Sequence, residues 1–296
     1  MFKGIFSTPP IPYVNKKIKL ELYDNFLNWQ KNQGIDNVYL LGTWGGHGLL
    51  NFNEKKSLIN NFSKICNKVK LKQIVNVSSF KEKEIIYLSN LAENTGVEAV
   101  SILLPQYYST AGYLKLSDYK RYVNRLLKEI KIPIYIYNNP RTMSVSLSPV
   151  EFSELSSEGI SGIKDGTKDI SWLIKTKNIL KRKKLNSEII PGNTQALIYG
   201  FLYGCSSVMT GASIVYPKTV RKIYDLIKQK KIKPAIDLHE KILNLRSMFG
   251  ISPPATAQAL ISNRIYNLGN SHPLWTKIKK KELLKIKKME KKFKLF

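Results

Sequence analysis

Two side chains in this sequence could together form and process an imine: the amine of Lys164 and the phenol of Tyr137. Each ends a short apolar run, 160–164 or 132–137, that suits a buried strand better than a helix. A lysine amine attacks a ketone only when it is neutral, and burial in apolar surroundings favours the neutral form. A phenol beside it can move the protons. The alternative is a lysine that merely ends a strand in solvent, because lysines are mostly exposed.

Two further segments carry residues that suit a binding site. The run LLGTWGGHG contains Gly42, Thr43, Trp44 and Gly45, where a turn of bare backbone and a hydroxyl could hold a carboxylate. An ordinary glycine-rich turn is the alternative. The run LLPQYYST places Tyr107 next to a second tyrosine after a proline, although paired tyrosines usually serve packing.

The elements around these residues alternate between strands and helices. Short β-rich runs occur at 4–8, 37–43, 73–78, 99–104, 132–138, 160–164, 188–192 and 207–211, with amphipathic segments between them. This alternation predicts an α/β protein with a parallel sheet, and eight units in succession predict a closed (β/α)₈ TIM barrel. A doubly wound sheet is the alternative, but no Gly-x-Gly-x-x-Gly follows the first strand.

In such a barrel the active site lies at the carboxyl ends of the strands. The isoleucines of IPIYIY share one face of their strand and the tyrosines share the other. We therefore expect Tyr137 to point into the barrel, within reach of Lys164 one strand along. The same alternation turns Gly162 inward, where it would leave room beneath the amine.

Strand-like runs stop after Pro217, and the rest of the chain is typical of helices. We predict a catalytic barrel over residues 1–230 and a C-terminal helical extension over 231–296 that packs on it. The lysine-rich run near the end carries Ile278, Leu283 and Ile286 at nearly helical spacing, so a docked helix with a solvated face is expected there.

The composition argues against several other classes of protein. The net charge of +27 comes mainly from lysines spread along the chain, which argues against nucleic-acid binding as a function. Cys66 and Cys205 have no metal-type spacing and fit a reducing compartment. No apolar run is long enough for a membrane span, and the N-terminus does not resemble a signal peptide. We expect a soluble, cytoplasmic protein.

The motifs GTWGG, YNNP and GIKDGT, in this order and at these distances, resemble the dihydrodipicolinate synthase / N-acetylneuraminate lyase family of class I aldolases. The resemblance covers about residues 4–217. It implies a TIM barrel that usually assembles as a homotetramer of two tight dimers, so we expect a dimer or tetramer. It also implies that Lys164 forms a Schiff base with pyruvate, that Tyr137 relays protons, and that Thr43 links Tyr137 to Tyr107 of a neighbouring subunit.

The same resemblance implies a pyruvate site. The turn at Gly42, Trp44 and Gly45 would hold the carboxylate, while Gly192 and Val208 match positions beside the pyruvate. Two departures fall in this turn. Gly46 stands where the family motif has glutamate, and Trp44 replaces a smaller threonine or serine.

A third departure concerns the second substrate. The synthases of this family carry an arginine shortly after YN-x-P that grips the carboxylate of aspartate semialdehyde. Here Thr142 falls at that position and Arg141 precedes it, so both are candidate substrate-binding residues.

These residues predict a Schiff-base lyase that acts on pyruvate, or a related 2-oxo acid, and an aldehyde of the sugar-acid type. The alternatives are 4-hydroxy-tetrahydrodipicolinate synthase, a 2-keto-3-deoxy sugar-acid dehydratase and a non-catalytic protein that binds a 2-oxo acid. Neither metal nor organic cofactor is implied, because His47, His239 and His272 lack ligand spacing.

Overall fold

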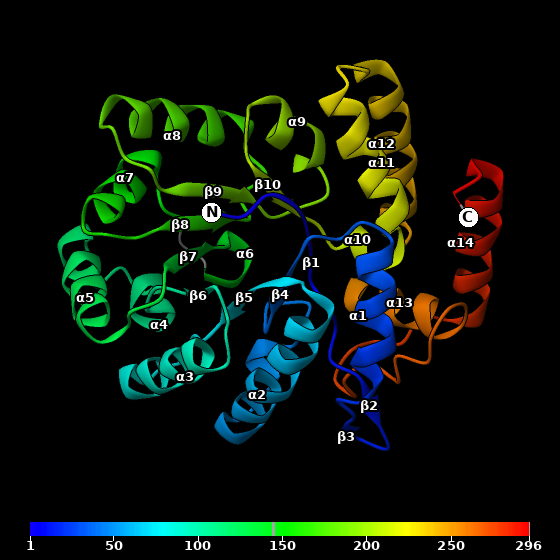
Figure 1. The fold of residues 1–296 in the computed structure, drawn as a ribbon, viewed down its shortest axis with the longest axis horizontal. Coiled ribbons are helices and arrows are strands. Elements are labelled where there is room, and N and C mark those ends of the chain that lie inside the picture. The colour runs from blue at the N-terminus through cyan, green and yellow to red at the C-terminus, as the bar shows by residue number, and fades with distance from the viewer. Residues whose placement is uncertain (144–145, 296) are drawn as a thin grey trace.

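Eight parallel strands form a nearly closed barrel in the computed structural model, which describes residues 1–143 and 146–295 without the side chains of Gln106, Thr142 and Met143. The strand order is β10-β1-β4-β5-β6-β7-β8-β9, and β9 also contacts β10 (Figure 1). Every strand of this barrel overlaps one of the eight predicted runs, so the predicted (β/α)₈ barrel is confirmed. The strands are β1 Gly4–Ser7, β4 Asn37–Leu40, β5 Lys72–Asn76, β6 Ala99–Ile102, β7 Ile134–Asn138, β8 Gly162–Asp165, β9 Glu188–Pro191 and β10 Ser207–Met209.

Helices surround the strands as an outer layer (Figure 1). Their apolar faces cover the outside of the sheet, and their exposed faces carry most of the charge. These helices are α1 Leu22–Asn32, α2 Phe52–Val69, α3 Glu82–Asn94, α5 Leu116–Glu129, α7 Pro149–Ser157, α8 Ile170–Arg182, α9 Ala196–Leu202 and α11 Pro217–Lys228.

Several short elements were not predicted from the sequence. A two-strand hairpin follows β1, and brief helical turns lie in the loops that connect barrel strands to the outer helices. Such short pieces have too few residues to show a period in the sequence. They are β2 Tyr13–Val14, β3 Lys17–Ile18, η1 His47–Leu49, α4 Gln106–Thr110, α6 Pro140–Met143 and α10 Ala212–Val215.

The strand β7 alternates as expected between the two sides of the sheet. Tyr135 and Tyr137 are both buried inside the barrel, where the Tyr135 hydroxyl donates a 2.7 Å hydrogen bond to Glu188. Gly162 faces inward as predicted, but the prediction that it leaves room beneath the amine was wrong. A Cβ there would lie 2.3 Å from the Tyr135 ring, so this glycine makes room for tyrosine and not for Lys164.

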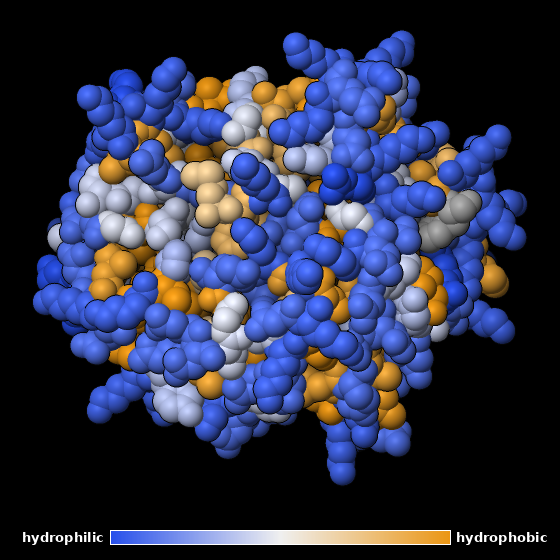
Figure 2. All heavy atoms as spheres, viewed as in Figure 1, coloured by the Kyte–Doolittle hydropathy of each residue, from blue (hydrophilic) through white to orange (hydrophobic). Residues whose placement is uncertain are grey.

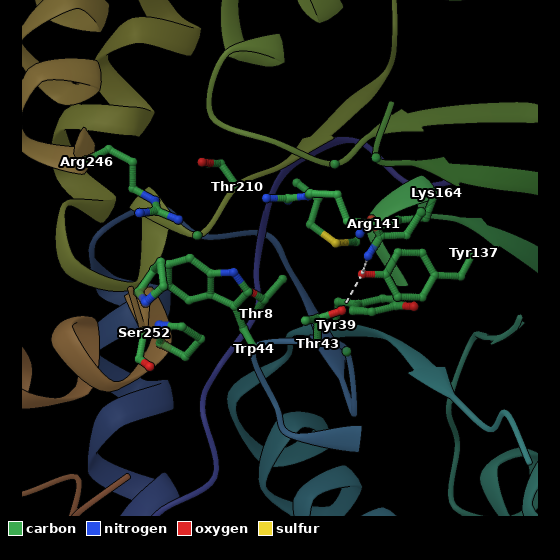
Figure 3. Close-up of a pocket in the computed structure, with 18 of the residues that line it drawn as sticks. Thr8, Tyr39, Thr43, Trp44, Tyr137, Arg141, Lys164, Thr210, Arg246 and Ser252 are labelled. Atoms are coloured by element: carbon green, nitrogen blue, oxygen red, sulfur yellow. Dashed lines mark hydrogen bonds between the residues drawn. The ribbon is translucent and has the colours of Figure 1, made fainter. Parts of the chain in front are cut away.

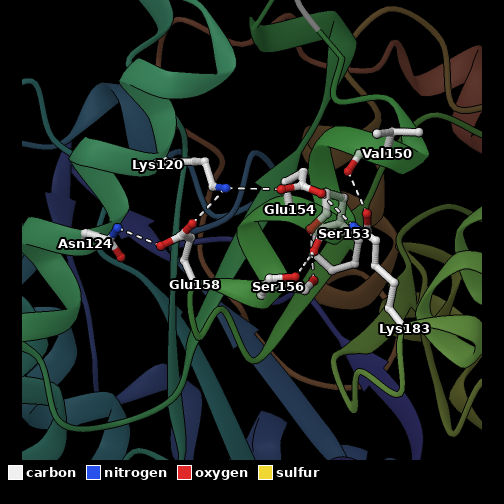
Figure 4. Close-up of polar contacts among 10 residues, drawn as sticks. Lys120, Asn124, Val150, Ser153, Glu154, Ser156, Glu158 and Lys183 are labelled. Carbon is white, nitrogen blue, oxygen red and sulfur yellow. Dashed lines mark hydrogen bonds and ion pairs between the residues drawn. The ribbon is translucent and has the colours of Figure 1, made fainter.

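Helices α5, α7 and α8 are joined by a network of ion pairs on the outside of the barrel (Figure 4). Lys120 pairs with Glu154 at 3.1 Å and with Glu158 at 2.8 Å, and Lys183 pairs with Glu154 at 2.6 Å. Asn124 adds a 2.8 Å hydrogen bond to Glu158. Because these groups are solvated, each pair contributes little, and the network mainly fixes how neighbouring helices align.

The C-terminal extension consists of α12 Ile232–Ser247, α13 Pro253–Ser262 and α14 Lys280–Phe293. The lysine-rich segment forms α14, with Ile286 fully buried. Glu290 of this helix is 3% exposed, accepts a 2.6 Å hydrogen bond from the Tyr216 hydroxyl and pairs with Arg264. A buried carboxylate with two donors therefore anchors α14, as the predicted docked helix requires.

Hydrophilic side chains project over most of the face seen in Figure 2, with apolar patches between them. Among the described residues, every helix is too short or too polar to span a bilayer.

Candidate active site

A cavity of about 370 Å³ opens at the carboxyl ends of the barrel strands. This is the end at which TIM barrels hold their active sites. Strands and loops of the barrel supply one wall, with Tyr137 and Lys164 among its residues. The C-terminal extension supplies the other, through Arg246, Ser252 and Trp275 (Figure 3).

Lys164 lies beside Tyr137 because strands β7 and β8 pair these two residues directly. The lysine side chain is only 6% exposed. Its Nζ lies 3.7 Å from the centroid of the Tyr137 ring and 5.9 Å from that of Tyr39. The amine thus sits among aromatic faces at the bottom of the cavity.

The Tyr137 hydroxyl is the hub of this site. It forms a 2.8 Å hydrogen bond with the Thr43 hydroxyl and accepts a 3.0 Å hydrogen bond from Nδ2 of Asn139. Burial alone would raise the pKa of Tyr137, but the positive charge of Lys164 and the hydrogen bonds from Lys164, Thr43 and Asn139 outweigh it and lower that pKa. This phenol is therefore suited to give up and regain a proton.

The glycine-rich turn after β4 is held in a strained conformation. Leu41 has φ of 58°, in the left-handed region that costs a branched residue about 1 kcal/mol or more. Asn76 holds the turn by donating a 2.9 Å hydrogen bond to the Leu41 carbonyl. Within the described residues, the backbone N–H groups of Thr43 and Trp44 donate to no protein acceptor. Two adjacent free donors at the cavity wall are suited to a carboxylate.

Trp44 is packed between two segments from far along the chain. A Cβ on Gly211 would lie 2.4 Å from the indole, so only glycine leaves space for it there. The Arg246 guanidinium lies over the indole ring, 4.9 Å from its centroid. The replacement of a small motif residue by Trp44 therefore connects the turn to the C-terminal extension.

Most of the predicted site residues line this one cavity. Gly45, Val208 and Tyr107 do not, and the Thr142 side chain lies outside the described residues. The predicted residues at the cavity are Gly42, Thr43, Trp44, Tyr137, Arg141, Lys164 and Gly192.

Val208 and Tyr107 lie elsewhere for different reasons. Val208 is fully buried and faces Gly200 of α9, while its neighbour Met209 lines the cavity, as the alternation of a strand requires. Tyr107 lies on α4, is 72% exposed and lines a separate surface cavity of about 870 Å³ together with His47. Within one chain, Tyr107 is therefore not part of the Lys164 cavity.

Sequence reasoning missed several cavity residues. Asn139 stands in the YNNP motif itself, and its amide could have been recognised as a donor to the neighbouring tyrosine. Arg246 and Trp275 belong to the C-terminal extension, where the helical pattern indicates packing faces and gives no sign that a polar side chain reaches the barrel mouth.

A family model described as the dihydrodipicolinate synthetase family matches residues 1–277. The chain belongs to this family. Two similar proteins named 4-hydroxy-tetrahydrodipicolinate synthase come from Methanococcus aeolicus and Thermosipho africanus. The first is 24% identical over 83% of both chains, and the second is 25% identical over 88% of both. Members of the dihydrodipicolinate synthetase family are pyruvate-dependent lyases that form a Schiff base, so the predicted enzyme class is confirmed.

Solved structures of the family share the fold. A protein called CdNal from Clostridium difficile, in complex with mannosamine, superimposes with a TM-score of 0.89 at 21% identity over the full length of both chains. YagE, a prophage protein of the dihydrodipicolinic acid synthase family from E. coli in complex with pyruvate, gives 0.88 at 17% identity, again over both full lengths. At this identity the likeness establishes the barrel and leaves the substrate open.

Proposed function

We propose that this chain is a Schiff-base aldolase that joins or cleaves pyruvate, or a related 2-oxo acid, and a sugar-derived aldehyde. The observation that carries the proposal is the buried amine of Lys164 beside Tyr137, whose hydroxyl is bonded to Thr43 and Asn139. Few roles other than imine chemistry need a buried amine beside a phenol whose pKa is lowered.

In the first half of the reaction, neutral Lys164 attacks C2 of pyruvate through its Nζ. Tyr137 gives its proton to the former carbonyl oxygen, which leaves as water when the imine forms. The free N–H groups of Thr43 and Trp44 hold the carboxylate, and Gly42 keeps the approach open. Holding the carbonyl against the lysine in this way lowers the entropic cost of bringing the two reacting groups together.

In the second half, the Tyr137 phenolate removes a proton from the pyruvyl methyl group and generates an enamine. The enamine carbon attacks the aldehyde carbon, and Tyr137 returns the proton to the new alkoxide. Water then hydrolyses the imine and frees Lys164. The lowered pKa of Tyr137 supports both directions of proton transfer.

The synthase reaction with aspartate semialdehyde is the second candidate. It is favoured by the names of the related proteins from Methanococcus aeolicus and Thermosipho africanus. Against it stands the register after YNNP, which puts Thr142 where those synthases have the carboxylate-gripping arginine. Successive positions of the helical turn α6 project about 100° apart, so Arg141, which lines the cavity, does not simply replace that arginine.

The lysine assignment is tested by trapping the imine. Incubation with pyruvate and borohydride should add one reduced pyruvyl mass to the intact protein, and Lys164→Ala should abolish the addition. Lys55→Ala is the matched control, because Lys55 is also a buried lysine and should leave labelling unchanged. Full labelling of the Lys164→Ala protein would overturn the assignment.

The aldehyde is tested by comparing kcat/KM for hydroxylated aldehydes with that for aspartate semialdehyde, pyruvate being fixed. We expect the hydroxylated aldehydes to be the better substrates. A clear preference for the semialdehyde that Arg141→Ala removes would restore the synthase function. Loss of water from a 2-keto-3-deoxy sugar acid would identify a dehydratase, and imine formation without any turnover would identify a binding protein.

We also infer that the active unit is a dimer or tetramer located in the cytoplasm. The exposed pair of Tyr107 and Tyr108 supports an interface at α4, since large aromatic side chains are enriched at such surfaces. Across that interface Tyr107 of one copy would join the Thr43–Tyr137 pair of another. The free, buried thiols of Cys66 and Cys205 support a reducing compartment.

A further inference from the structure

Arg246 enters the cavity of Lys164 from outside the barrel. It is the penultimate residue of α12, and its guanidinium lies over Trp44 at 4.9 Å and near Phe249 at 5.2 Å from the ring centroids. Figure 3 shows Arg246 and Trp44 at one end of the row of cavity side chains and Lys164 at the other. The guanidinium is thus held in place by aromatic rings at the end of the cavity remote from the amine.

Two other cations lie close to Arg246. Burial, together with the charge of Arg141, lowers the pKa of Arg246 to about 10. Burial also lowers the pKa of Lys168, with further contributions from Arg141 and Arg246. In residues 1–143 and 146–295, no carboxylate forms an ion pair with any of the three. Arg246 is half-buried, whereas Arg141 and Lys168 are exposed, so the three together give this part of the site a positive charge that favours an anionic ligand.

The position of Arg246 depends on the close packing of the Trp44 indole against Gly211. Gly211, after β10, is the residue that lets the Trp44 indole lie where it does, and the indole in turn lies under the guanidinium. Three segments distant in sequence therefore meet to present this one charge to the cavity. An exposed surface arginine would need no such support.

Building on the proposed aldolase function, we propose that the second substrate is a hydroxylated aldehyde with an anionic group at its far end, bound by Arg246 with Arg141 beside it. A terminal carboxylate and a terminal phosphate share this chemistry, since both accept paired hydrogen bonds from a guanidinium. Because Arg246 and Lys164 lie at opposite ends of the row, the anion is well separated from the reacting carbonyl. Arg246 is then a specificity-determining residue.

The test compares matched aldehydes at fixed pyruvate. Glyceraldehyde is paired with glyceraldehyde 3-phosphate, erythrose with erythrose 4-phosphate, and a neutral pentose with its terminal carboxylate analogue. The wild-type enzyme should prefer the anionic member of at least one pair. Arg246→Met should lower kcat/KM for that member on the order of 10- to 100-fold, while the neutral member changes by only a few-fold. The pair that shows the preference identifies whether the anionic group of the substrate is a phosphate or a carboxylate.

Arg182→Met serves as the matched control, because Arg182 is an exposed arginine at the end of α8 away from the cavity, and it should leave the preference intact. Arg246→Lys keeps the positive charge but loses the paired hydrogen bonds of a guanidinium. It should therefore retain part of the preference for the anionic aldehyde that Arg246→Met loses. Equal use of neutral and anionic aldehydes by the wild type, or a preference that survives Arg246→Met, would overturn the inference. Pyruvate labelling separates the two proposals: Arg246→Met should still be labelled fully, whereas failure of the wild type to be labelled would refute the aldolase function itself.

Discussion

Gly192 lies directly against the side chain of Lys164. A Cβ at position 192 would be 2.5 Å from Cε of the lysine and 2.9 Å from the Asp165 carbonyl oxygen. The backbone cannot move aside easily, because the Gly192 N–H donates a 2.6 Å hydrogen bond to that same carbonyl. The absence of a side chain at Gly192, directly after strand β9, therefore fixes the path of the Lys164 side chain on strand β8.

Gly192→Ala is expected to slow imine formation by at least about tenfold, since a displaced nucleophile loses its positioning. The rate of borohydride-trapped labelling with pyruvate measures this directly. Gly200→Ala is the control: its Cβ would meet Val208 at 2.8 Å, so it should strain the core without touching Lys164. If both variants are labelled at the wild-type rate, Gly192 does not set the lysine position.

Tyr137→Phe should still form the imine slowly but lose most turnover. Removing a general acid–base group typically costs about 10²–10⁴-fold. Single-turnover labelling and steady-state kcat, measured on the same preparation, separate the two effects. A kcat within a few-fold of the wild type would mean that another group moves the protons.

Asn139→Ala should move the acidic limb of the pH–rate profile to higher pH. The Asn139 amide donates to the Tyr137 oxygen and helps to lower the pKa of that phenol, so its loss raises the pKa. Because the phenolate of Tyr137 is the base, a higher pKa leaves less phenolate at neutral pH. The activity there should therefore fall about tenfold, and full activity should appear only at higher pH. Thr43→Ser, which keeps the hydroxyl, should leave the limb in place. An unmoved limb in Asn139→Ala would assign it to a different group.

Mixing two inactive variants tests the role of Tyr107 across an interface. In a mixed dimer of Lys164→Ala and Tyr107→Phe chains, the site that retains Lys164 would receive an intact Tyr107 from its partner. Activity should therefore rise well above that of either variant alone after co-expression. No gain, or full activity of a monomer in light scattering, would remove Tyr107 from the relay.

His239 predicts a pH dependence of stability. It bonds the Thr194 carbonyl through Nε2 at 2.7 Å, and burial is the main reason that its pKa is lowered. The folded chain then favours neutral histidine, so its contribution is complete above the unfolded pKa of about 6.5 and is lost as pH falls below it. Between about pH 7.5 and about pH 5, the Tm of the His239→Gln variant should fall by roughly 2–4 °C less than the Tm of the wild type. An identical fall in both proteins would contradict this.

The barrel and the pairing of Tyr137 with Lys164 were predictable because both follow from short-range patterns. Alternation along β7 turns Tyr137 inward, and the turn residues mark where strands end. The neighbour predicted for Gly162 was wrong because periodicity gives the side of a sheet but not which side chain fills the space there. Only the packed structure shows that Tyr135 lies against Gly162 and that Gly192 lies against Lys164.

Arg246 could not be predicted for a related reason. An arginine near the end of an amphipathic helix usually faces solvent, and nothing local distinguishes this one. Its direction is set by contacts with Trp44 and Phe249, which depend on how the extension packs on the barrel. Packing between segments far apart in the chain produces no periodic pattern in the sequence from which it could be predicted.

The two walls of the cavity come from different parts of the chain, so substitutions can change one wall without changing the other. Barrel strands carry the lysine and the tyrosine, whereas Arg246, Ser252 and Trp275 come from the last quarter of the chain. Substitutions in that quarter could retune which aldehyde is accepted while the bond-making step stays intact. A library confined to the extension would therefore be an efficient source of aldolases with altered substrate range.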